Sequence, residues 1–243
     1  MDLSITQVPL WLSITFIVSF VTIPIFLIAN AANKAYYKGK TEAGIKIRNK
    51  ILIFYWTYLV IVALVSLTGV FVQNTFPPLI VVTVALPLLA FYMLYVLRQS
   101  WFKTVLQNIR LDQLVYVHIF RFVGVFFFLV YAYGGLPKSF AYIGGAGDII
   151  TAILVIPVVM ALRQKKSYAK GLTWVWNFIG LTDIISVLVT ATIITNHAIE
   201  NGLPGVQQFG TFPFSWIPAF APATIIFFHF IIFKKLLEKN ESL

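Results

Sequence analysis

The chain contains no cysteine, which excludes disulfides, thiolate metal sites and cysteine nucleophiles. Charged residues are scarce, at 11% of 243 positions, and acidic ones are the scarcest, with 8 against 18 basic residues. By contrast, 60% of the residues are hydrophobic, far more than in a soluble domain. Such a chain can fold only with much of its surface in apolar surroundings. The composition therefore predicts an integral membrane protein, with residues 1–243 forming a single domain.

Seven apolar runs are long enough to be membrane spans, since about 20 residues cross roughly 30 Å of hydrocarbon. The runs cover residues 8–29, 51–72, 79–97, 114–133, 140–162, 173–195 and 213–233. The connections "QNTFPP" and "GGLPKS" contain Pro and Gly, which is typical of tight turns. The spans that they join are expected to be antiparallel hairpins. The predicted fold class is all-α, a polytopic bundle of seven transmembrane helices.

The basic residues predict the orientation of the bundle. Sixteen of the 18 lie in the first, third and fifth loops or after the last span, and the exceptions are Lys138 and Arg121. By the positive-inside rule, the N-terminus is expected outside and the C-terminus in the cytoplasm. A bias shared by every inner loop is a topology signal, so the net charge of +10 does not indicate a nucleic-acid partner.

Two aspartates lie inside long apolar runs, Asp148 in "GGAGDIITAIL" and Asp183 in "NFIGLTDIISVL". Both stretches share the pattern G-x-x-D-I-I-[ST] on spans of opposite direction. At 1.5 Å per residue, both aspartates are predicted within about 3 Å of the membrane mid-plane. Thr151 is expected on the helical stripe of Asp148, and Ser186 on that of Asp183.

Arg121 is the basic residue within a span, in the stretch "VHIFRFVG". It is expected about 10 Å from the cytoplasmic end, with its side chain extending towards the centre. One arginine and two aspartates leave one negative charge in excess, and a charge at the bilayer centre costs about 2.5–3.5 kcal/mol. The site is therefore expected to hold a shared proton or to capture a cation. A static ion-pair clamp with one protonated aspartate remains the alternative.

Two histidines complete the set of intramembrane polar residues. His118 is expected one turn before Arg121 on a neighbouring face, and His229 near the inner end of the last span, level with Asn177. Three interpretations stay open: ordinary hydrogen-bonding histidines, a proton relay to the aspartates, or axial ligands of a haem b. The candidate coupling or ligand-binding residues are Asp148, Asp183, Arg121, Asn177, His118, His229, Thr151 and Ser186.

Several familiar activities are excluded by missing residues. Seven spans with an outer N-terminus resemble the rhodopsin architecture, but retinal needs a lysine in the last span and residues 213–233 contain none. No H-E-x-x-H, P-loop or G-x-S-x-G signature is present. No catalytic residue or metal ligand is therefore predicted, and an enzyme is not favoured.

Four motifs occur together from the fourth span onwards: His118-x-x-Arg121, Gly-x-Gly-Asp148, Trp176-Asn177-x-x-Gly180-x-x-Asp183 and a late His229. This combination resembles a set of small, uncharacterised bacterial multi-pass membrane proteins. The resemblance implies a protein of the bacterial inner membrane and brings no activity with it.

The function favoured by these features is a proton- or cation-coupled carrier of a small solute, because mid-membrane acids between helices are typical of secondary transporters. Seven spans are few for a complete carrier, so a homo-oligomer is expected. The alternatives are a structural or accessory membrane subunit, and a redox protein or enzyme that uses His118 and His229 on the cytoplasmic side. The expected partners are the lipid bilayer and a proton, cation or small solute.

Overall fold

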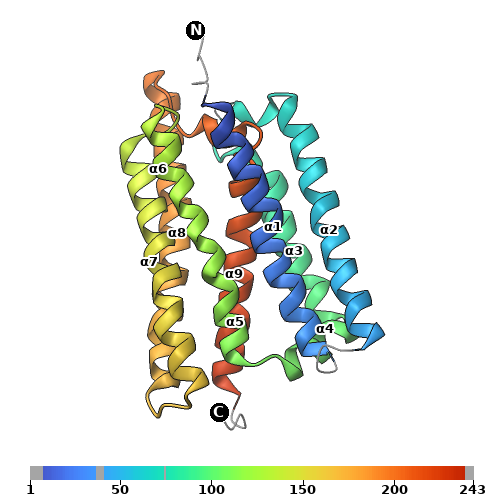
Figure 1. The fold of residues 1–243 in the computed structure, drawn as a ribbon. Helices are drawn as coiled ribbons and strands as arrows, with labels where there is room; N and C mark the ends of the chain where they lie inside the picture. The colour runs from blue at the N-terminus through green and yellow to red at the C-terminus, as the bar shows by residue number, and fades with distance from the viewer. Residues whose placement is uncertain (1–7, 37–40, 74, 239–243) are drawn as a thin grey trace.

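The computed structural model describes residues 8–36, 41–73 and 75–238. Within these residues the protein is helical and contains no strand. Seven helical segments are long and apolar enough to cross a membrane (Figure 1). They are Leu10–Ala35 (α1), Glu42–Leu67 (α2), Val81–Arg98, Leu111–Ala132, Lys138–Arg163 (α7), Ala169–Asn201 (α8) and Trp216–Leu237 (α9). The all-α fold and the seven potential spans are thereby confirmed.

Several helices extend beyond the apolar runs that predicted them. The helix α2 begins at Glu42 rather than at residue 51, because the hydroxyl of Thr41 accepts a hydrogen bond from the backbone N–H of Gly44 at 3.1 Å. A side-chain cap of this kind satisfies a donor that the first turn leaves unpaired. At the other extreme, α8 continues to Asn201 and ends at Gly202, whose φ of 63° is left-handed. Hydropathy does not detect polar turns at helix ends, so these ends are located only from their capping residues.

The third span is irregular. It opens with a π-helical turn, Val81–Ala85, continues as α3, Leu86–Leu94, and ends in a 3₁₀ turn, Val96–Arg98. Pro87 lies at the start of α3, where it lacks the N–H that a regular helix would donate to the preceding turn. Beyond this span lies a short helix that the sequence did not predict, α4, Ser100–Asn108. It buries Val105 and lies at one end of the bundle (Figure 1).

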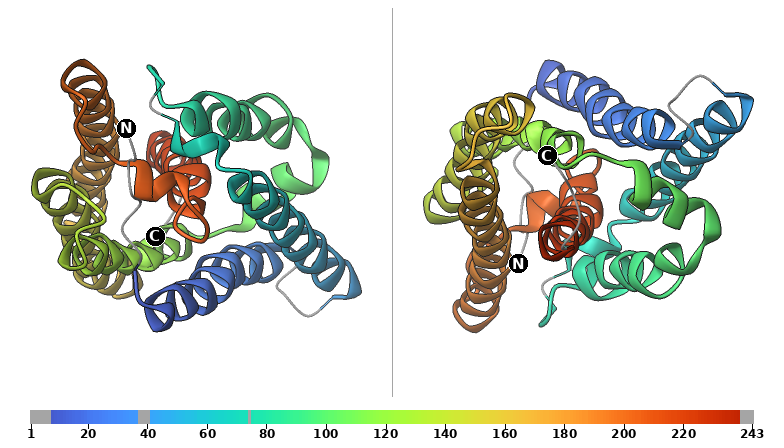
Figure 2. Two further views of the ribbon diagram at one scale, coloured as in Figure 1. Left: turned by 90° about the horizontal axis from the view of Figure 1, so that it is seen from above. Right: turned by 90° about the horizontal axis from the view of Figure 1, so that it is seen from below.

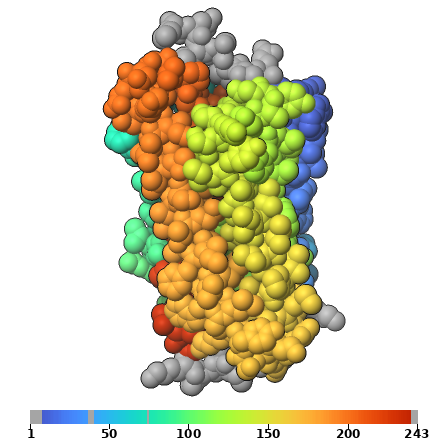
Figure 3. Space-filling model, turned by 90° about the vertical axis from the view of Figure 1, so that its left-hand side faces the viewer, coloured from blue at the N-terminus to red at the C-terminus, as the bar shows by residue number. Residues whose placement is uncertain are grey.

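The most buried span, α9, lies in the middle of the bundle (Figure 2). One group of helices around it contains α1 to α4, and the other contains the fourth span with α7 and α8. Small buried residues, among them Ala219, Ala221 and Ala223, occur along α9 and allow neighbouring helices to approach closely. Figure 3 shows α7 and α8 side by side on one outer face.

The fourth span changes its helical form where it carries its polar residues. It consists of α5, Leu111–Val117, a 3₁₀ helix, His118–Gly124, and α6, Val125–Ala132. A 3₁₀ helix has three residues per turn, so residues three apart lie on one face. His118, Arg121 and Gly124 are all buried and share that face. The expectation that His118 lies on a neighbouring face was wrong, because it assumed an α-helix of 3.6 residues per turn.

The basic residues gather at one end of the bundle. The end of α1, the start of α2, α4, the turn between α7 and α8, and the end of α9 all lie there (Figure 1). The described basic residues at this end include Lys34, Arg98, Lys103, Arg163 and Lys234. Lys38, Lys40 and Lys239, which also contributed to the predicted bias, lie outside the described residues.

Candidate polar site inside the bundle

Arg121 is completely buried and connects the fourth span to two other helices. Its Nε donates to Oδ1 of Asp148 on α7 at 2.7 Å, and its Nη2 donates to Oδ2 of Asp183 on α8. Its Nη1 donates to the backbone oxygen of Gly180 at 3.0 Å. Each nitrogen of the guanidinium therefore has its own acceptor. The structure brings Arg121, Asp148 and Asp183 into direct contact.

The charges in this contact do not balance. Among the described residues, Arg121 is the cation paired with Asp148 and with Asp183, and no other is paired with either. Two ionised carboxylates and one guanidinium would leave one net negative charge in surroundings where an unpaired charge is costly. The side chain of Asp183 is 10% exposed, against 6% for Asp148. Asp183 is thus the carboxylate with easier access from outside the cluster.

Three glycines make room for these side chains. A Cβ atom on Gly147 would overlap the carboxylate of Asp183. One on Gly124 would lie 2.6 Å from Cβ of Asp148. A Cβ on Gly180 would similarly lie 2.6 Å from Cε1 of His229. The fourth span, α7, α8 and α9 can therefore approach closely at these points only because the three positions lack side chains. Gly147 and Gly180 belong to motifs noted in the sequence, but none of the three glycines was assigned a role from the sequence.

His229 on α9 is held by Asn177 on α8. Its Nδ1 lies 2.7 Å from Oδ1 of Asn177, while Nδ2 of Asn177 donates to the backbone oxygen of His229 at 3.1 Å. A carbonyl oxygen only accepts, so the second bond sets the orientation of the amide, and Oδ1 must accept from Nδ1–H. The Nε2 atom lies 3.4 Å from Nη1 of Arg121, which can only donate. These contacts match the neutral form of His229 that carries its proton on Nδ1.

His118 lies directly against His229, with the ring centroids 4.3 Å apart. Both rings are completely buried. Among the described residues, neither nitrogen of His118 has a hydrogen-bond partner, and the indole of Trp176 packs edge-on against it at 5.1 Å. An iron bound by both imidazoles would have to lie between the rings. Rings in contact leave no space there, so this geometry does not fit a haem held by the pair.

The two predicted hydroxyl residues have different surroundings. Thr151 is buried, its hydroxyl has no partner among the described residues, and its backbone oxygen accepts from Nε1 of Trp176 at 3.1 Å. The hydroxyl of Ser186 instead donates to the backbone oxygen of Asp183 at 2.7 Å. This local bond is common for serine within a helix. The Ser186 hydroxyl therefore donates its proton to the backbone and not to a carboxylate, whereas the Thr151 hydroxyl lies in the interior.

A further buried acid, outside this site, was not predicted from the sequence. Asp112 is 4% exposed and accepts from Nε of Arg110 at 2.8 Å and from Nε of Arg163 at 3.0 Å. The apolar run that predicted the span begins at residue 114, so Asp112 was left in the preceding loop. Within residues 8–36, 41–73 and 75–238, no group of three or more His, Cys, Asp or Glu side chains is arranged to hold a metal ion.

We call Arg121, Asp148, Asp183, Asn177, His118 and His229 the polar cluster. All six residues lie between positions 76 and 237, the part of the chain that matches the family model described as "Domain of unknown function (DUF8737)". Neither a curated protein nor a solved structure matches the chain. The matched segment runs from just before the third span to the end of α9. The protein belongs to the DUF8737 family, which has no assigned function.

Proposed function

We propose that this membrane protein is a proton- or cation-coupled carrier of a small solute, with Asp148 and Asp183 as the coupling pair. One observation carries the proposal: a single fully buried arginine contacts both carboxylates. A cluster with one guanidinium and two carboxylates reaches neutrality by binding one proton or one monovalent cation. Two acids so close together exchange that proton as a unit.

The surroundings support an exchangeable charge at this position. The cluster lies where the fourth span, α7, α8 and α9 meet, and secondary transporters commonly bind coupling ions at such helix interfaces near the mid-plane. Asp183, the more accessible carboxylate, is the group that would receive and release the proton. Arg121 would keep Asp148 in place through the exchange, because its Nη1 is anchored independently by Gly180.

The two histidines lie on one side of the cluster, and we propose that they relay protons to it once water completes the hydrogen-bond chain that His118 lacks. The rings of His118 and His229 are in contact, and Nε2 of His229 faces Arg121. A relay through them would lead towards the basic end of the bundle. By the positive-inside rule this end is cytoplasmic, which puts the N-terminus outside. We further propose a single domain in a bacterial inner membrane that works as a homo-oligomer.

Proton binding by the purified protein in detergent tests this function. Wild-type protein is expected to take up about one proton more than the Asp148→Asn/Asp183→Asn double variant between roughly pH 9 and pH 5. Asp112→Asn is the matched control, since Asp112 is also a buried acid bonded to arginine but lies outside the cluster. Equal uptake by wild type and double variant would exclude a shared proton. Proton flux into liposomes then tests coupling.

A structural or accessory role is the second candidate, and it has its own supporting observation. Arg121 contacts Asp148 on α7, Asp183 on α8 and His229 on α9. A side chain that joins so many helices can serve as a static clamp. In that case the two Asp→Asn substitutions would lower thermal stability and leave proton flux unchanged. A carrier would instead lose flux.

A further inference from the structure

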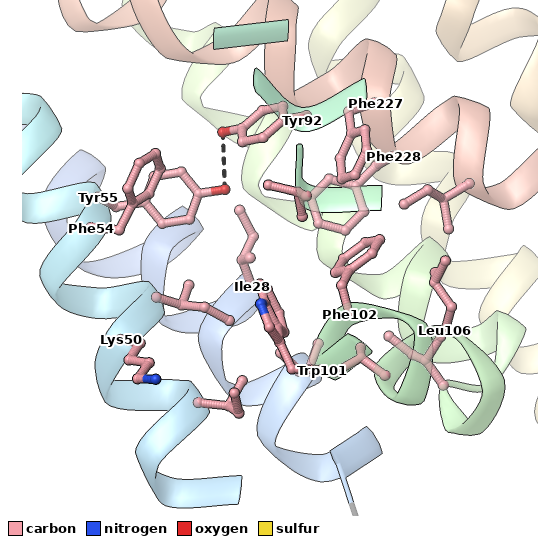
Figure 4. Close-up of a pocket in the computed structure, with 18 of the residues that line it drawn as sticks. Ile28, Lys50, Phe54, Tyr55, Tyr92, Trp101, Phe102, Leu106, Phe227 and Phe228 are labelled. Carbon is pink, nitrogen blue, oxygen red and sulfur yellow. Dashed lines mark hydrogen bonds between the residues drawn. The ribbon is translucent and has the colours of Figure 1, made fainter. Parts of the chain in front are cut away.

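A partly open pocket of about 220 Å³, whose lining contains no residue of the polar cluster, lies between α1, α2, α3, α4, α5 and α9 (Figure 4). Its walls are almost entirely apolar and rich in aromatic rings. An apolar cavity of roughly 150 Å³ is enough to hold benzene, so this pocket has space for one ring or a short chain. The rings that face it include Phe54, Tyr55, Phe91, Tyr92, Trp101 and Phe102.

The inner end of this aromatic pocket carries hydroxyl groups. The hydroxyl of Tyr92 donates to that of Tyr55 at 3.0 Å, and Oγ1 of Thr224 lies 3.2 Å from the Tyr92 hydroxyl. Since Tyr92 donates to Tyr55, Thr224 must donate to Tyr92. The Tyr55 hydroxyl is then the last in this row of hydrogen bonds, and its own proton has no acceptor among the three hydroxyls. Tyr55 lines the pocket (Figure 4), so its O–H is available to an acceptor there.

The opposite edge of the pocket is basic. Lys50 is exposed and lies on α2 about 7.5 Å along the helix axis from Tyr55. Trp101 on α4 faces both of them from across the pocket in Figure 4. The pocket therefore has a neutral hydrogen-bond donor at its inner end, aromatic faces in its middle and a cation at its edge.

We propose that the aromatic pocket binds a membrane-dissolved quinone, with one ring carbonyl oxygen accepting a hydrogen bond from the Tyr55 hydroxyl. A flat ring packs favourably against Phe and Trp side chains. A lipid acyl chain would fill the same space but has no acceptor, and it would leave the buried Tyr55 donor unpaired, which is unfavourable. The pocket is partly open, so the tail of a bound quinone would extend out of it. This site does not depend on the polar cluster or on the carrier function.

Binding is tested with a decyl-substituted benzoquinone added to the purified protein in detergent. Quenching of tryptophan fluorescence reports occupancy, and Trp101→Phe should remove part of the quench because Trp101 lines the pocket. Tyr55→Phe is expected to weaken binding about fivefold to tenfold through the lost hydrogen bond. Tyr58→Phe is the matched control, since the Tyr58 hydroxyl donates to the backbone oxygen of Ala219 and the side chain does not line the pocket.

Two further measurements keep the result decisive if Tyr55→Phe folds poorly. Ala32→Phe places a ring in the pocket from α1 and should abolish quenching. Decylbenzene, which has the tail and ring without carbonyls, should bind wild type and Tyr55→Phe with equal affinity. Equal quinone affinity in wild type and Tyr55→Phe would overturn the proposal. Displacement of the quinone by dodecanoate in a Lys50-dependent manner would identify a fatty-acid site in its place.

Discussion

Gly147 on α7 lies directly against the carboxylate of Asp183 on α8, so closely that a Cβ at position 147 would overlap it. The Arg121–Asp183 ion pair therefore depends on the absence of a side chain on a third helix. The packing of α7 against α8 at Gly147 and the Arg121–Asp183 ion pair are therefore coupled.

Replacing Gly147 with alanine is expected to push the Asp183 carboxylate away from Arg121. The loss of a hydrogen bond between charged groups should cost about 1.5–3 kcal/mol of unfolding free energy, measured by thermal or denaturant unfolding in detergent. Gly171→Ala on α8 is the control, since a Cβ there meets nothing within 4 Å. That substitution should be neutral or slightly stabilising. If both variants were equally stable, Gly147 would have no such role.

Replacing Arg121 with leucine leaves two buried carboxylates without their cation. Removal of one partner from a buried ion pair typically costs about 3–5 kcal/mol. The triple variant Arg121→Leu/Asp148→Asn/Asp183→Asn should regain much of this stability, because it removes the uncompensated charge as well. Unfolding temperatures of the three proteins provide the comparison. A triple variant less stable than Arg121→Leu alone would contradict the charge argument.

The hydrogen bonds around His229 predict a single neutral tautomer. With Nδ1 donating to Asn177 and Nε2 accepting from Arg121, the ¹⁵N signals of a histidine-labelled sample should show Nδ1 protonated and Nε2 bare at neutral pH. His229→Gln identifies the signals by their loss. Asn177→Ala should remove the preference, since Asn177 Oδ1 is the acceptor that selects the tautomer. An Nε2–H signal that is present in wild type and lost in His229→Gln would disprove the assigned network.

The predicted orientation can be tested by cysteine labelling, because the chain has no native cysteine that would also react. Lys138→Cys lies at the exposed start of α7, and Lys165→Cys in the exposed turn between α7 and α8. A membrane-impermeant maleimide should label Lys138→Cys in intact cells and Lys165→Cys only after the membrane is permeabilised. The reverse pattern would place the N-terminus in the cytoplasm.

The amino-acid sequence was sufficient to predict the helical class and the number of potential spans. A bilayer requires backbone polar groups to bond within each span, so apolar length alone identifies a helix. The same cost of burying charge drew attention to Arg121, Asp148 and Asp183. Hydropathy located the helix ends poorly, as at Glu42 and Asp112, because polar end turns carry no apolar signal. The amphipathic helix α4 was missed for the same reason.

The tertiary structure decided which side chains meet. The 3₁₀ form of residues 118–124 aligns His118 with Arg121. No sequence pattern predicted this change from 3.6 to three residues per turn. His118 and His229 are in contact although they belong to the fourth and seventh spans. The hydroxyls of Tyr55 and Tyr92 likewise come from different helices. Hydropathy records how deep a residue lies in the membrane, whereas the rotation and packing of each helix determine its neighbours.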